Sequence, residues 1–188
     1  MCDSAVRGWV RVTVSGDCYV GTTTVAEMLA ARSRWVHRNV GVLVRSICSR
    51  RGVDPAHFGA LSNDQLIGVD RDTVVEMKKT EGSIWEGRLT SWLARDDPQT
   101  LRVWISASFE QRVVRAMRRD GLDRSSAERV IVQRDTEEAT LFSRLYGVDT
   151  DSLHKCCHIA FDSSGMSAST IAGAIGRVLA EEADDVVP

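Results

Sequence analysis

A short stretch near the amino-terminal end carries the residues best suited to chemistry. Gly16 and Gly21 are separated by four residues, and three threonines follow at positions 22–24. Two glycines at this spacing let backbone N–H groups turn inward around an anion, and a following hydroxyl can ligate a metal ion. The residue types and their spacing predict a phosphate-binding loop.

The elements on either side of the loop agree with this prediction. An apolar, β-branched run at residues 9–14 predicts a buried strand, and residues 23–33 predict a helix. Strand, glycine loop and helix form the layout of the P-loop, GxxxxGK[ST], in which Thr23 stands at the Mg²⁺-ligand position. The alternative is a glycine turn that only closes a strand–helix unit.

Two residues of the loop depart from that pattern. Thr22 stands where the P-loop lysine belongs, so the ammonium that spans the β- and γ-phosphates is missing. Asp17 adds a carboxylate, which repels a triphosphate unless a metal ion or a hydrogen bond neutralises it. We therefore expect weak binding of ATP.

Glu86 and Arg88 follow a short predicted strand at residues 83–85. A carboxylate at a strand end near a P-loop can hold Mg²⁺ or its water, and an arginine two residues later can bind a phosphate with two parallel hydrogen bonds. A surface ion pair would explain this tripeptide equally well.

Arginines are concentrated between residues 112 and 134. A mobile segment of this kind can close over a phosphoryl-transfer site and spread the charge of the transition state. An ordinary solvated helix face is the alternative. The segment contains Arg112, Arg115, Arg118, Arg119, Arg124, Arg129 and Arg134.

Predicted strands and helices alternate along the chain, which favours a parallel sheet covered by helices on both faces, with ligands at the carboxyl ends of the strands. Tryptophans are expected in the core, although Trp92 could border a base pocket. Further strands are predicted at 35–40, 101–105 and 158–162, and further helices at 41–51, 64–79, 109–119, 125–144 (one or two helices) and from Ser167 or Ser169 to 179.

Composition limits the function classes. The 188 residues suit one domain, and a net charge of −2 gives no reason to expect a nucleic acid polymer as partner. Apolar runs stay well below the roughly 20 residues of a membrane span. Five cysteines, an odd number without a disulfide-framework spacing, favour a reduced, cytoplasmic setting.

Several segments, taken in order, resemble one family. They are VTVSG and GTTTVA in the loop, GVLVR, EGRLTSWLA, LRVWISASFEQRVVRAMRRDG, QRDTEEA and RLYGVD. Over roughly residues 10–180 the chain is similar to the archaeal-type cytidylate kinases, which belong to the P-loop nucleoside monophosphate (NMP) kinases.

The resemblance implies an α/β fold, the three-layer P-loop NTPase fold, with helical NMP-binding and lid segments. Residues 1–188 would form one domain, with a P-loop unit at 9–33, an NMP-binding part at 34–80 and a lid region at 112–146. The resemblance also implies Mg²⁺ and ATP as cofactors, and CMP or dCMP as the small-molecule acceptor. The oligomeric state stays open.

Residue roles follow from the same resemblance. Thr23 and Glu86 would hold the metal. The phosphate- and nucleotide-binding set would be Gly16, Gly21, Thr23, Thr24, Gly41, Arg45, Arg88 and Arg112. The catalytic set would include Glu86, Arg115, Arg119 and Arg134. Asp17 and Thr22 join the candidate catalytic set because of their places in the loop, where they depart from the pattern.

The chain also departs from the family pattern. Besides Thr22, Val42 replaces an acidic residue, and Leu141 and Phe142 stand where the family usually has Arg-Tyr. Three hypotheses result: a kinase acting on a cytidine-type or modified NMP, a nucleotide phosphate hydrolase using Asp17 or Glu86 as base or nucleophile, and a non-catalytic nucleotide-binding protein.

Overall fold

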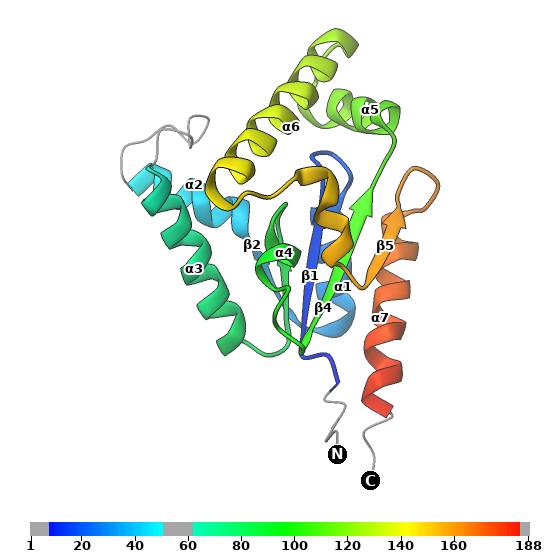
Figure 1. The fold of residues 1–188 in the computed structure, drawn as a ribbon. Coiled ribbons are helices and arrows are strands. Elements are labelled where there is room, and N and C mark those ends of the chain that lie inside the picture. Colours follow the sequence, from blue (N-terminus) through cyan, green and yellow to red (C-terminus); the bar gives the residue numbers. More distant parts are fainter. Residues whose placement is uncertain (1–7, 51–61, 185–188) are drawn as a thin grey trace.

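A computed structural model of the protein describes residues 8–50 and 62–184. Its centre is a parallel five-stranded sheet in the order β2-β3-β1-β4-β5 (Figure 1). The strands are β1 Arg11–Gly16, β2 Val36–Asn39, β3 Ser83–Glu86, β4 Thr100–Ser106 and β5 Ile159–Asp162. All five lie where the sequence predicts a strand.

Helices cover both faces of the sheet, which confirms the predicted α/β architecture. α1 and α7 pack side by side on one face, while the short α4 and the 3₁₀ helix η2 lie against the other (Figure 1). The helices are α1 Thr22–Ser33, α2 Val40–Arg50, α3 Asn63–Lys79, α4 Thr90–Leu93, α5 Phe109–Asp120, α6 Arg124–Tyr146, η2 Thr150–Cys156 and α7 Ala168–Asp184.

Sequence reasoning missed two elements and left a third undecided. α4 and η2 are each short, so their apolar residues show no full helical period. Residues 124–146 form one helix, α6, which Asp123 caps by accepting a hydrogen bond from the Ser126 N–H. Ser167 rather than Ser169 caps α7, because its Oγ accepts from the Thr170 N–H.

The main core lies between the sheet and the α1–α7 layer. Val12 and Val14 of β1 are fully buried, as are Leu29 of α1 and Ile171 of α7. β-branched residues fit the pleated surface of a strand that is buried on both faces. This packing fixes β1 and α1 rigidly, and with them the loop that joins them.

The strand register brings three residues to one edge of the sheet. Asn39 at the end of β2 is paired with Glu86 at the end of β3, and β1 ends beside them at Gly16. α5 and α6 lie above this carboxyl edge (Figure 1). None of the described helices is long and apolar enough to cross a membrane.

Candidate active site

The glycines of the loop are required by its shape. A Cβ atom at Gly16 would lie 2.2 Å from the carbonyl oxygen of Ile105, so β1 approaches β4 this closely only without a side chain. Gly21 has a φ of 97° and immediately precedes α1, whose first turn contains no acidic residue. The free backbone N–H groups and the dipole of α1 therefore favour an anion at the N-terminus of this helix.

The loop borders a cavity of about 820 Å³ at the carboxyl edge of the sheet, with α2, α3 and α6 forming its other walls. Many of the predicted site residues converge here. Those lining the cavity are Gly16, Asp17, Thr22, Thr23, Gly41, Arg45, Glu86, Arg88, Arg119 and Arg134. Gly21, Thr24, Arg112 and Arg115 are not among its lining residues.

Glu86 is the buried carboxylate of this cavity, with 3% of its surface exposed. Its Oε1 accepts hydrogen bonds from Thr23 Oγ1, at 2.9 Å, and from Asn39 Nδ2. Its Oε2 lies 3.5 Å from His37 Nε2 and has no hydrogen-bond partner in the described part of the chain. Burial raises the pKa of the Glu86 carboxyl, against the hydrogen bond from Thr23 and the nearby His37, which lower it.

This donor set fits magnesium. Mg²⁺ prefers oxygen ligands and is usually held by one or two carboxylates together with phosphates and water. Oε2 of Glu86 is an unsatisfied carboxylate oxygen beside the hydroxyl of Thr23. A cation there would offset the cost of burying the carboxylate.

Asp17 is neutralised by two arginines. Its Oδ1 lies 3.0 Å from Arg88 Nη2, and its Oδ2 lies 3.7 Å from Arg112 Nη1. The repulsion expected between this carboxylate and a triphosphate is therefore reduced within the protein itself. Arg112 also donates to the Cys18 carbonyl oxygen at 2.8 Å, which ties α5 to the loop.

Two carboxylates of α6 complete the ion-pair cluster around these arginines. Arg88 Nη1 lies 3.0 Å from both Asp135 Oδ1 and Glu138 Oε2, and Arg112 Nη2 donates to Asp135 Oδ2 at 2.7 Å. The Arg88 side chain is only 11% exposed. Both of its terminal nitrogens contact carboxylates, so a phosphate at Arg88 would compete with them.

Arg45 offers a less restrained cation on the opposite wall. It is exposed, and no described residue forms an ion pair with it. Gly41 leaves room for it, because a Cβ atom there would lie 3.2 Å from Arg45 Nη1. Asn39 orients this wall, since its Oδ1 accepts a hydrogen bond from the Val42 N–H in the first turn of α2.

Arg115 lies behind the loop instead of inside the cavity. Its guanidinium donates to the carbonyl oxygens of Val20, at 2.8 Å, and Ser163, at 2.6 Å. Both acceptors are backbone carbonyl oxygens of the protein, and the catalytic role expected for Arg115 stays a prediction. Arg115 thereby links the loop to the residue that follows β5.

Arg119 and Arg134 stand at the open rim of the cavity, with side chains 60% and 44% exposed. Arg119 is paired with Asp120 at 2.8 Å, whereas Arg134 makes only a 3.8 Å contact with Glu138. Both side chains are exposed enough for a ligand in the cavity to reach them. Thr24, by contrast, is exposed and does not line the cavity.

The far end of the cavity is apolar. Leu141, Phe142 and Leu145 of α6 line it together with Leu66 of α3. The two positions where the resemblance places Arg-Tyr therefore contribute apolar surface here.

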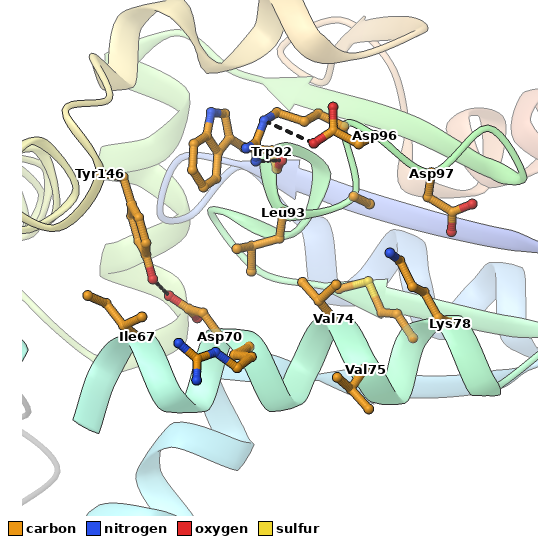
Figure 2. A pocket seen from close by; sticks show the side chains of 14 residues that line it. Ile67, Asp70, Val74, Val75, Lys78, Trp92, Leu93, Asp96, Asp97 and Tyr146 are labelled. Atoms are coloured by element: carbon orange, nitrogen blue, oxygen red, sulfur yellow. Dashed lines mark hydrogen bonds and ion pairs between the residues drawn. The ribbon is translucent and has the colours of Figure 1, made fainter. Parts of the chain in front are cut away.

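Trp92 is not among the residues that line this cavity, and its place beside a base stays a prediction. It lines a second cavity, of about 430 Å³, between α3 and the segment around α4 (Figure 2). Asp70 borders both cavities and accepts a hydrogen bond from the Tyr146 hydroxyl (Figure 2). Burial raises the pKa values of Asp70 and Tyr146, which keeps the tyrosine protonated as the donor.

Sequence reasoning missed four polar residues of the site: His37, Asn39, Asp135 and Glu138. For Asn39 a signal existed, because asparagine is a typical N-cap and this one lies near the predicted boundary between a strand and a helix. For Asp135 and Glu138 the helical spacing put them near Arg134, but nothing local pointed to Arg88.

Comparisons with known proteins identify cytidylate kinases as relatives of this chain. Residues 37–164 match the cytidylate kinase-like family, a segment that begins after the glycine loop. The chain is 31% identical over 157 residues to a cytidylate kinase of Methanopyrus kandleri, covering 77% of this chain and 80% of that protein. It is 27% identical over 147 residues to a cytidylate kinase of Methanocaldococcus jannaschii, covering 76% and 82%.

A solved structure supports the fold. Shikimate kinase from Acinetobacter baumannii superimposes with a TM-score of 0.63 at 14% identity, covering 92% of this chain and 94% of that one. At this identity the likeness shows only the P-loop kinase fold. The match over residues 37–164 and the archaeal relatives support a nucleotide kinase-like function, and the chain belongs to the cytidylate kinase-like family.

Proposed function

We propose that the protein transfers the terminal phosphoryl group of Mg-ATP to a cytidine-type or modified nucleoside monophosphate. The observation that carries this proposal is the convergence on one cavity of the α1 N-terminus, the Glu86–Thr23 pair and Arg45. These are a site for donor phosphates, oxygen ligands for Mg²⁺ and a cation for the acceptor phosphate.

The proposed division of labour follows from these positions. The backbone around Gly21 would bind the donor phosphates, and Glu86 and Thr23 would hold Mg²⁺, which would supply positive charge against that of the phosphates. Arg45, beside Gly41, binds the acceptor phosphate. An oxygen of that phosphate attacks the terminal phosphorus of ATP, and the bond to the ADP oxygen breaks.

Residues 34–80 would then be the acceptor-binding part and residues 112–146 the lid, as the family resemblance implies. The lid arginines Arg119 and Arg134 replace the missing P-loop lysine in this proposal. Arg88 and Arg112 act mainly by holding Asp17 and α6 in place.

Hydrolysis of a nucleotide phosphate has less support. Both carboxylate oxygens of Asp17 face guanidiniums, so neither oxygen can approach a phosphorus atom without disturbing an ion pair. Glu86 is buried and accepts two hydrogen bonds. A non-catalytic nucleotide-binding protein would have the same cavity and no turnover.

Measuring product formation with and without CMP separates these proposals. CMP-dependent release of ADP supports the kinase, phosphate release from CMP without ATP supports the hydrolase, and binding without turnover supports the third. Calorimetric titration with Mg-ATP should give weak affinity, because Thr22 supplies no charge. A submicromolar dissociation constant would contradict that expectation.

A further inference from the structure

Tyr19 occupies an unusual backbone conformation inside the loop. It lies between Gly16 and Gly21 and has a φ of 61°, in the left-handed region that favours glycine. A bulky residue persists in such a conformation only where its surroundings hold it there. The contacts of its ring and hydroxyl therefore bear on what the loop does.

The ring of Tyr19 contacts two arginines of the cavity rim. The Cζ atom of Arg119 lies 4.3 Å from the ring centroid, and that of Arg134 lies 5.7 Å away. Both distances are within the roughly 6 Å at which a guanidinium is attracted to an aromatic face. One side chain of the loop thus contacts a cation from the end of α5 and another from α6.

The hydroxyl of Tyr19 strengthens one of these contacts. It donates to Asp120 Oδ2 at 2.7 Å, and Asp120 accepts from Nε and Nη2 of Arg119, at 2.8 and 3.1 Å. Arg119 is therefore held by both the ring and a carboxylate that the same tyrosine orients. Arg134 is held by the ring and by its loose contact with Glu138.

Tyr19, Arg119, Arg134 and Thr22 all line the same cavity. The two side chains keep about half of their surface exposed, so they can still donate to a ligand. Thr22 marks the position where a P-loop has its ammonium and this chain has no charge. Two of the guanidiniums that line this cavity are the ones that Tyr19 contacts.

We propose that Tyr19 is a positioning residue that holds Arg119 and Arg134 over the phosphate loop, where they supply the charge that Thr22 lacks. The ligand they serve is a polyphosphate chain, such as that of a nucleoside triphosphate. This inference rests on the proposed function for its role in turnover, but its binding part can be tested separately.

A purely structural role for Tyr19 is the rival explanation, since the residue also packs against Val113 and Ala116. Two variants separate the explanations. Tyr19→Leu retains apolar packing but removes the aromatic face and the hydroxyl, whereas Tyr19→Phe retains the face. Because phenylalanine also retains the packing volume, a Thr22→Lys background completes the test. A structural role predicts the same loss from Tyr19→Leu with threonine or lysine at position 22, and a positioning role predicts that lysine reduces the loss.

The first test uses calorimetric binding of inorganic tripolyphosphate with Mg²⁺, which requires no acceptor. We expect Tyr19→Leu to weaken binding about tenfold and Tyr19→Phe to stay within about threefold of wild type. In a Thr22→Lys background the loss caused by Tyr19→Leu should shrink to about twofold, because the lysine restores the charge. Arg119→Gln should weaken binding, while Arg118→Gln, one position away and exposed, should not.

The second test is spectroscopic. The Nε–Hε resonance of Arg119 should carry a ring-current shift that Tyr19→Phe retains and Tyr19→Leu abolishes. Equal tripolyphosphate affinity in wild type and Tyr19→Leu, an undiminished loss in the Thr22→Lys background, or no binding by the wild type would each overturn the inference. Binding that follows the expected pattern without ADP formation from any NMP would instead contradict the proposed function alone.

Discussion

Asp17 and Thr22 determine how much positive charge the loop itself offers to a ligand. Thr22 contributes none, and the carboxylate of Asp17 is balanced by Arg88 and Arg112, so those cations are already engaged. Charge for a phosphate must then come from backbone N–H groups, a metal ion and the exposed arginines of the rim. The first two predictions concern the buried charges on which this arrangement depends.

Arg88 should be required for stability as well as for function. Arg88→Met leaves Asp17, Asp135 and Glu138 without their shared partner, and breaking a largely buried ion pair on one side costs about 3 kcal/mol. Arg88→Lys should be milder in stability yet still impaired in turnover, because a point charge cannot contact three carboxylates as a planar guanidinium does. Denaturant unfolding measures the first effect and ADP release the second.

The control for Arg88 is Arg118→Met on exposed surface of α5, which should unfold at the wild-type denaturant concentration. Wild-type stability of Arg88→Met would show that the ion-pair cluster does not form in solution.

Glu86 should make stability depend on pH in a predictable direction. Its folded-state pKa is raised above its ordinary value of 4.5, because burial disfavours the charged form. Between these two pKa values the folded state binds more protons than the unfolded state, so this group's contribution to stability falls as pH rises. Glu86→Gln should therefore raise Tm at pH 8 by a few degrees in the absence of metal, and the gain should vanish near pH 4.

Magnesium should reverse the order of the two Tm values, so that the wild type becomes more stable than Glu86→Gln. Saturating Mg²⁺ with a nucleotide should raise the Tm of the wild type and have less effect on Glu86→Gln, because the variant lacks the carboxylate that would hold the ion. The exposed variant Glu76→Gln should respond as the wild type does. Equal responses of all three proteins would argue against Glu86 as a metal ligand.

Among the elements, β1 and the glycine loop after it depend most on the close approach of the β1 backbone to β4. The carbonyl oxygen of Ile105 leaves no space for a side chain at Gly16, because β1 pairs with β4 up to its own last residue, Gly16. α1 then starts directly after Gly21 and is fixed by the core. Strand packing thus sets the conformation of the loop, which is formed without a ligand.

Gly16→Ala should consequently destabilise the protein by about 2 kcal/mol or more, since the added carbon meets backbone that cannot move without disturbing the sheet. Gly165→Ala provides the comparison, because a Cβ atom there has no atom of a described residue within 4 Å. Urea unfolding of the two variants gives the difference. Equal midpoints would mean that the strands separate easily at Gly16.

At the scale of the whole molecule, the sequence predicted what local patterns determine. The strand–loop–helix order located Gly16 and Gly21, and the strand before Glu86 placed that carboxylate at the same sheet edge. Contacts between distant segments could not be predicted this way. The pairing of Arg88 with Asp135 and Glu138, the placement of Arg115 behind the loop and the stacking on Tyr19 all depend on how α5 and α6 cross the sheet edge.

The central claim is that a kinase site remains although the P-loop lysine is absent. Thr22→Lys returns a cation to the point where charge develops on the transferred phosphoryl group, so the remaining site should use it. The most direct measurement is CMP-dependent ADP formation by wild type and Thr22→Lys, alongside phosphate release from CMP alone. We predict slow ADP formation by the wild type and an increase of about tenfold or more in the variant. No increase in ADP formation, together with a loss of ATP-independent phosphate release, would contradict the kinase and favour the hydrolase.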